Sequence, residues 1–136
     1  MTAGGILAYT ENAAAVVIDA TIAITDADDT HISSATVTIT SVVTGDVLGF
    51  ATQNGITGVY TSSTGVLALS GTATLAQYQA ALRSVTYRNT SEDPTVNNTR
   101  NNRTITWNVT DANSDAVGAQ TSVGVTSTVN FTAIND

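Results

Sequence analysis

Hydrophobic and polar residues alternate in seven segments of this chain. In the segment 34–40 (SATVTIT) apolar residues hold every second position and polar residues, mostly threonine, fill the positions between them, and the segment 104–110 (TITWNVT) repeats the pattern around Trp107. A period of two places one set of side chains on a core and the other set in solvent, as in a strand of an antiparallel sheet. The same period recurs in five further segments: 20–25, 46–51, 56–61, 65–71 and 121–133.

Turn-forming residues separate these segments. They occur at 44–46 (TGD), 53–55 (QNG), 63–65 (STG) and Gly71, close to the spacing of about 8–12 residues that is typical of a sandwich. The pattern therefore predicts an all-β fold in which about seven or eight antiparallel strands form two packed sheets.

One segment departs from the period of two. Leu75, Tyr78 and Leu82 follow the i, i+3, i+7 spacing of a helix face, and Thr74 is a suitable N-cap residue. We predict a short helix over about 74–83 that crosses one end of the sandwich and leads into a strand at 84–88.

The segment 91–103 (SEDPTVNNTRNNR) contains the single proline and many asparagines, which indicates a long solvated loop. Arg100 and Arg103 could form an anion-binding patch. Because Glu92 and Asp93 lie close by and no aromatic residue accompanies the arginines, a polar loop is the favoured interpretation.

Composition narrows the functional classes. The chain has 136 residues, which fits a single domain, with four arginines, no lysine and a net charge of −7. Phosphate backbones and anionic membrane surfaces both require basic faces, so we expect no nucleic-acid partner and no membrane insertion. The absence of cysteine excludes disulfides, thiolate metal sites and cysteine nucleophiles. The N-terminus carries no signal-peptide pattern, and no segment is long and apolar enough for a membrane span.

The sequence offers little for catalysis. His31 is the single histidine, and a lone histidine in a loop is far more often solvated than catalytic. No nucleophile elbow, phosphate-binding loop or metalloprotease motif is present. A pair of glycosidase carboxylates is set by space and not by sequence spacing, so it stays open. We expect that the protein is not an enzyme.

Carboxylates gather where strands end. Asp26 and Asp28 follow the second predicted strand, Asp111 follows the tryptophan strand, and Glu11 and Asp136 stand near the two termini. Oxygen ligands from several loops at one end of a sandwich suit Ca²⁺, which takes 6–8 of them in flexible geometry. The alternative is that these residues only form turns and caps.

The order and context of these residues resemble a known family. YTENAAAVVIDATIAITDADD, LGFATQNGITGVYTSSTGVLALSGTATLAQYQAALRSVTYRNTS and the closing TAIND are similar to cadherin-like repeats of giant bacterial surface proteins, the RTX-type adhesins exported by type I secretion. The helix followed by a V-x-Y strand is also similar to repeats of chondroitin-sulfate proteoglycans. The resemblance implies that residues 1–136 form one Ig/cadherin-like antiparallel β-sandwich repeat that ends at an inter-repeat linker, 133–136.

The resemblance also implies a role for Ca²⁺ between neighbouring repeats. Asp26, Asp28 and Asp111 match the ligands that face the preceding repeat. Glu11 matches the glutamate of the first strand and, with the linker residues Asn135 and Asp136, would serve the junction to the following repeat. The Asp-Arg-Glu motif of true cadherins has no counterpart here, which leaves the number of ions per junction open.

The implied function is that of an extracellular, cell-surface extender repeat that is stiffened by Ca²⁺ and supports bacterial adhesion or biofilm formation. Its partners would be neighbouring repeats, and in isolation we expect a monomer.

The alternative is a carbohydrate- or protein-binding sandwich module. Sugar sites usually need exposed aromatic side chains, and Trp107, Phe50 and Phe131 hold inward positions. The remaining candidates are Tyr9, Tyr60, Tyr78 and Tyr87, for which core or edge packing is the simpler interpretation. Because the last segment, 121–133, is long and uncharged, we also expect it to lie inside a sheet and not at an edge.

Overall fold

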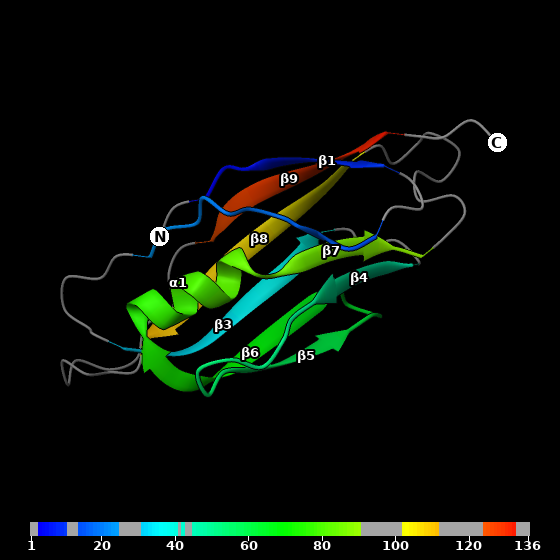
Figure 1. The fold of residues 1–136 in the computed structure, drawn as a ribbon. Helices are drawn as coiled ribbons and strands as arrows, with labels where there is room; N and C mark the ends of the chain where they lie inside the picture. The colour runs from blue at the N-terminus through cyan, green and yellow to red at the C-terminus, as the bar shows by residue number, and fades with distance from the viewer. Residues whose placement is uncertain are drawn as a thin grey trace.

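The computed structural model describes residues 3–10, 14–24, 31–40, 42, 45–90, 102–111 and 124–132, with only the backbone described at 111, 131 and 132. The described strands form two sheets that face each other across one core (Figure 1). The larger sheet has six strands in the order β1-β9-β8-β3-β6-β5, and the smaller has three in the order β2-β7-β4. The prediction of an all-β sandwich is confirmed. The strands are β1 (Ile6–Thr10), β2 (Val16–Val17), β3 (His31–Thr40), β4 (Asp46–Gly49), β5 (Thr57–Thr61), β6 (Val66–Thr74), β7 (Thr86–Asn89), β8 (Asn102–Asp111) and β9 (Val125–Thr132).

The alternation of the sequence sets which side chains form the core. β3 pairs with β8 in antiparallel register, with Val37 opposite Trp107 and Ile39 opposite Ile105. All four side chains are buried. Burying one side chain of this size contributes about 1.5–3 kcal/mol, so a shift of one residue, which would expose the whole set, is strongly disfavoured.

The one helix of the described residues, α1 (Leu75–Arg83), is the predicted one. Thr74 caps it by a capping box, in which the Gln77 N–H donates to Thr74 Oγ1 while the Thr74 N–H donates to Gln77 Oε1. Tyr78, Ala81 and Leu82 face the core. The strand that follows begins at 86 and not at 84, because residue 84 caps the helix C-terminus through its N–H. In the described ranges no helix is long and apolar enough to cross a membrane.

The expected strand at 20–25 is wrong over its described part, 20–24, which lies outside the named strands. Ile22 and Ile24 are nevertheless buried. One backbone group of each bonds to a helix side chain: Arg83 Nε donates to the Ile22 carbonyl at 2.7 Å, and the Ile24 N–H donates to Gln79 Oε1 at 3.1 Å. The apolar alternation thus identified the buried residues but not the partner of the backbone.

Gly71 was expected to mark a turn, but it lies inside β6, where the pairing of β6 with β3 shifts register. Its φ is +116°, and a Cβ added there would lie 2.2 Å from the Gly55 carbonyl oxygen. The turn that it touches is the predicted one at Asn54 and Gly55, both at positive φ, closed by a pair of backbone hydrogen bonds between Gln53 and Ile56. Close approach of two backbones explains why only glycine fits at 71.

The first and last strands run side by side. β1 pairs in parallel with β9, with Ile6 opposite Thr128 and Thr10 opposite Thr132. On its other edge β9 pairs with β8, so the expectation that this segment lies inside a sheet is confirmed for 125–132. Because the two strands are parallel, the described chain enters at one pole of the elongated sandwich and leaves at the other, as Figure 1 shows.

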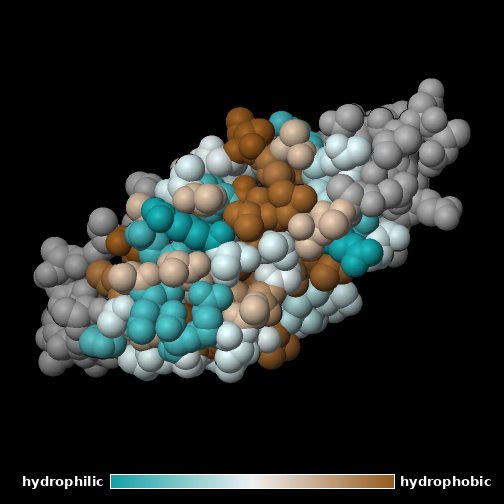
Figure 2. Space-filling view, in the orientation of Figure 1, coloured by the Kyte–Doolittle hydropathy of each residue, from teal (hydrophilic) through white to brown (hydrophobic). Residues whose placement is uncertain are grey.

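The flank of the sandwich at β1 and β2 and the outer face of the large sheet differ in the polarity of their side chains. Figure 2 shows hydrophobic side chains along the flank formed by β1 and β2, where Ile6, Val16 and Val17 are exposed. The outward positions of β3, β8 and β9 carry hydroxyl and amide groups, and their described side chains include no Asp, Glu, Lys or Arg. These outward residues are Thr36, Thr38, Thr40, Thr104, Thr106, Asn108, Thr126, Thr128 and Asn130.

Candidate functional site: the poles and two buried carboxylates

The described strand ends define two poles. Thr10 and Thr132 are register partners at the ends of β1 and β9, so the segments that contain Glu11 and Asp136 depart from adjacent points. At the other pole Asp111, the last residue of β8, is the register partner of Ile32 near the start of β3. This strand end thus lies beside the beginning of the strand that follows the Asp26 segment.

The predicted Ca²⁺ ligands themselves fall almost entirely outside the described residues. Glu11, Asp26, Asp28, Asn135 and Asp136 belong to segments that are not described, and Asp111 is described by its backbone alone. Within the described ranges, no three His, Asp or Glu side chains gather as metal ligands. The ligand set therefore stays a prediction. The described strand ends that are nearest to these residues in the sequence are divided between the two poles.

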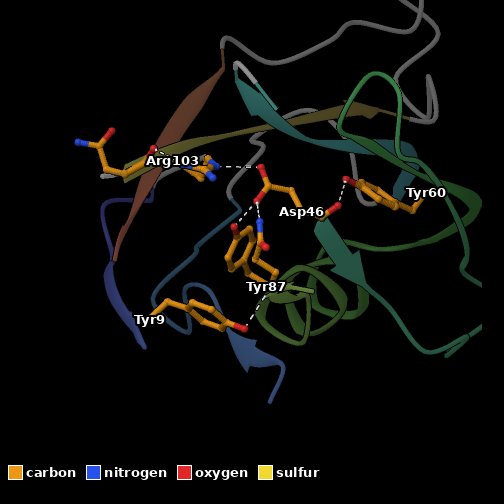
Figure 3. A network of polar contacts seen from close by, with 7 residues as sticks. Tyr9, Asp46, Tyr60, Tyr87 and Arg103 are labelled. Carbon is orange, nitrogen blue, oxygen red and sulfur yellow. Dashed lines mark hydrogen bonds and ion pairs between the residues drawn. The ribbon is translucent and has the colours of Figure 1, made fainter. Parts of the chain in front are cut away.

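The first of two buried carboxylates in the described structure belongs to Asp46, at the start of β4. Its Oδ2 accepts from Arg103 Nε at 2.8 Å, and its Oδ1 accepts from Asn89 Nδ2 at 2.7 Å and from the Tyr87 hydroxyl. Figure 3 shows Asp46 between Arg103 and Tyr87. Because β4 belongs to the small sheet and β8 to the large one, the ion pair ties the two sheets together.

Arg103 corrects the expectation of a solvated polar loop at 91–103. It is the second residue of β8, only 1% exposed, and it pairs with a carboxylate instead of forming an anion-binding patch. The reason is its inward position in the alternation of β8, where an unpaired cation would be costly and a buried counter-charge compensates it. Arg100 lies outside the described residues.

Tyrosines extend the Asp46 network. The Tyr60 hydroxyl donates to the Asp46 backbone carbonyl at 2.7 Å, and the Asn89 N–H donates to Tyr9 Oη at 3.1 Å. The rings of Tyr9 and Tyr87 meet edge to face at 5.2 Å. Burial, together with the hydrogen bond to Asp46 and its charge, raises the pKa of Tyr87 far above its usual value, so this hydroxyl remains a donor.

These contacts remove the aromatic candidates for a sugar site. Tyr9, Tyr78 and Tyr87 are fully buried, Tyr60 is half-buried against the core, and Trp107 is buried as expected. The interpretation of the tyrosines as packing residues is confirmed.

The second buried carboxylate belongs to Asp19, and its described partners are neutral donors. Its Oδ2 accepts from the N–H groups of Gly4 and Gly5 at 3.1 and 2.7 Å and from Ser127 Oγ at 2.5 Å. Its Oδ1 accepts from the Thr21 N–H at 2.8 Å and from the Thr21 hydroxyl. Ser127 Oγ in turn accepts from Trp107 Nε1 at 2.9 Å. Asp19 therefore links the lead-in to β1 with β9 and β8.

Two opposing effects act on the pKa of Asp19. Burial by itself raises it, but the hydrogen bonds from Ser127, Thr21 and Gly5 outweigh burial and hold the pKa well below its usual range. The side chain is thus a fixed anion at neutral pH.

Sequence reasoning missed both carboxylates. Asp46 was assigned to a turn, and Asp19 was not singled out. A signal existed for Asp19, because a single acid inside the apolar run AVVIDATI is unusual for an exposed turn. His31 also differs from expectation: it is the first residue of β3 and only partly exposed, not a loop residue.

Comparison with known proteins gives one finding of similarity. The chain is 42% identical to Halomucin from Haloquadratum walsbyi over an alignment of 86 positions, and the match covers 58% of this chain and 1% of that protein. No family model matches, and no solved structure matches. The match supports a likeness to a small part of a very large archaeal protein, while the finer resemblance to RTX-type cadherin-like repeats stays a prediction.

Proposed function

We propose that this chain is a structural, non-catalytic repeat module of a very large extracellular or cell-surface protein, where it extends other parts of that protein away from the cell. The observation that carries the proposal is the parallel pairing of β1 with β9. Modules of this topology that follow one another in a chain would join pole to pole and form a rod. The similarity to 1% of Halomucin supports the proposal, because a module of this kind is a small part of a long chain.

The distribution of charge supports the same function. Asp19 and Asp46 are the described acids with described side chains, and both are buried. In the sequence, the remaining nine of the eleven acids, Asp111 with its undescribed side chain included, stand at a strand end, between strands or after the last strand. Acids that follow strand ends in the sequence suit modules that meet end to end around a divalent cation.

We further propose that Ca²⁺ stiffens the junctions. Glu11, Asn135 and Asp136 would supply oxygen ligands at one pole, and Asp26, Asp28 and Asp111 at the other, where the next module completes the coordination. The finer assignment to bacterial adhesins that are exported by type I secretion and act in adhesion or biofilms rests on the sequence resemblance alone.

Thermal unfolding tests the proposal. The chain and a tandem of two copies are unfolded in excess EDTA and in millimolar Ca²⁺, with Asp26→Ala and Asp28→Ala as variants. A ligand that binds only the folded state contributes about 2.7 kcal/mol at 100 times its Kd, which corresponds to a rise of roughly 10 °C in midpoint. We expect this rise in the tandem and its loss in both variants.

Glu92→Ala is the matched control, because it removes an acid that was not assigned as a ligand and should keep the full Ca²⁺ response. Small-angle scattering gives the second readout, in which Ca²⁺ should lengthen the tandem to an extended shape. A tandem whose melting midpoint and dimensions are the same in EDTA and Ca²⁺ contradicts Ca²⁺ stiffening. A tandem that stays compact in both conditions contradicts the rod itself.

A further inference from the structure

The pairing of β1 with β9 determines how tension would act on this fold. A pull on the two chain ends draws β1 toward the pole at Ile6 and β9 toward the pole at Thr132. The strands are parallel and adjacent, so they would have to slide past each other. The hydrogen bonds along the five register pairs then resist together, whereas strands pulled apart from one end lose their bonds one at a time.

A second set of bonds secures the pulled end of β1. The Gly4 and Gly5 N–H groups, which lie just before β1, both donate to Asp19 Oδ2, and that same oxygen accepts from Ser127 Oγ in β9. The Thr128 N–H donates to the Gly5 carbonyl at 3.0 Å. The backbone just before β1 is thus held to β9 twice, once directly and once through a carboxylate.

The site is shaped for this contact. A Cβ on Gly5 would lie 2.6 Å from Asp19 Cγ, so glycine is needed for the carboxylate to approach the backbone. Asp19 and Ser127 are only 2% and 1% exposed, which keeps water from competing for their hydrogen bonds, and bonds to an ionised acceptor are roughly twice as strong as neutral ones. The Trp107 indole, fully buried in β8, fixes the Ser127 hydroxyl by donating to it.

We propose that Asp19, Ser127 and the backbone of 4–5 form a load-bearing clamp that holds the start of β1 against β9 when the module is pulled by its ends. The clamp rests on the proposed function, because only a module within a rod carries tension through both ends. Under such a pull, force reaches Gly4 and Gly5 first. It then passes through Asp19 into β9 before it loads the β1 ladder.

Single-molecule pulling tests the clamp with the intact 136-residue chain in EDTA. Asp19→Asn keeps the size of the side chain but removes its charge and one acceptor oxygen, and Ser127→Ala removes the link to β9. We expect each variant to unfold at least about tenfold faster than the wild type at the same force applied through the termini. This acceleration should exceed the one measured without force by urea unfolding, since forced unfolding follows the unfolding rate of the loaded path.

Tyr78→Phe is the matched control. It deletes a buried hydrogen bond, from Tyr78 Oη to the Gly71 carbonyl at 2.6 Å, that joins α1 to β6 and touches neither β1 nor β9. Its acceleration under terminal force should equal its acceleration in urea. If Asp19→Asn does not fold, Ser127→Ala and Gly5→Ala serve in its place.

A second pulling direction distinguishes contacts that carry the applied force from contacts that only stabilise the fold. The chain has no cysteine, so Val47→Cys in β4 and Val59→Cys in β5, both exposed, provide unique handles away from β1. In this direction the Asp19 and Ser127 variants should lose their excess acceleration. Equal acceleration in both directions, or wild-type rates under terminal force, would overturn the clamp. A rod that fails to form in the tandem measurement would overturn the proposed function and leave the force result standing.

Discussion

Two carboxylates are buried in this sandwich, and they are stabilised in opposite ways. Asp46 has a buried cation, Arg103, at 2.8 Å. Asp19 is held by backbone N–H groups and hydroxyls, through five hydrogen bonds to neutral donors. In the first network the charge is cancelled by one partner, and in the second it is spread over many dipoles.

The difference determines which network a single substitution can destroy. Removal of Arg103 would leave a buried anion without its counter-charge, which is among the costliest single changes in a protein. Three of the five donors to Asp19 are backbone groups that no side-chain substitution deletes. The Asp46 ion pair is therefore lost with one side chain, whereas no single side-chain substitution removes all the donors to Asp19.

The largest expected effect is that of Arg103→Met. The variant keeps a long apolar side chain inside the core but leaves Asp46 unpaired, so we expect a loss of about 3–5 kcal/mol in the free energy of unfolding. Urea unfolding with a constant m-value measures it. The double variant Asp46→Leu with Arg103→Met removes both charges and should recover most of the loss. A double variant that is as unstable as Arg103→Met would mean that packing, and not charge, is the main contribution of Arg103.

An intermediate effect is expected at Asp19. Asp19→Asn should cost about 2–3 kcal/mol at pH 7, the scale of a hydrogen bond to a charged group, because the amide NH₂ cannot accept from the N–H groups that bond to the oxygen it replaces.

The pH dependence gives the sharper measurement at Asp19. The folded-state pKa is lowered, so its stabilisation is complete above the unfolded value of about 3.9 and is lost as the pH falls below it, by up to about 1.4 kcal/mol per pH unit for one proton. Urea unfolding between pH 6 and pH 2 should show a smaller slope in Asp19→Asn than in the wild type. An unchanged slope would exclude Asp19 as a source of the acid sensitivity.

The contrast between these networks also shows where sequence reasoning succeeds. The alternation around Trp107 and the cap at Thr74 are local patterns, and the structure has both as predicted. The same alternation was applied to 20–25 and failed there, because the partner of that backbone is a helix 55 to 61 residues away in sequence. Local periodicity indicates burial, but it carries no information on which distant group satisfies a backbone N–H or carbonyl.

The buried charges show the same limit. Arg103 stands at an inward position of a strand pattern. The proline and the many asparagines of 91–103 nevertheless favour a loop. Its partner Asp46 lies 57 residues away, a distance at which no spacing rule applies. The placement of acids after strand ends is, in contrast, a local feature of the sequence, and their assignment to two poles through the resemblance stays a prediction.

The smallest expected losses of stability are those of two tyrosine variants in the Asp46 network. Tyr60→Phe removes a bond to the Asp46 backbone carbonyl from a half-buried hydroxyl that water can partly replace, so we expect a loss of about 0.5–1.5 kcal/mol. Tyr87→Phe removes a donor to the carboxylate itself in a fully buried site and should cost about 1–3 kcal/mol.

Combination with Arg103→Met distinguishes the two roles. Tyr87 shares the carboxylate with Arg103, so Tyr87→Phe should be non-additive with the loss of the cation, with a coupling of at least about 0.5 kcal/mol. Tyr60 bonds to the backbone, and its effect should add to that of Arg103→Met within error. Urea unfolding of the three single variants and the two double variants measures both couplings. Equal coupling for the two tyrosines would mean that the network responds as one unit. The coupling to Arg103 would then not depend on a direct hydrogen bond to the Asp46 carboxylate.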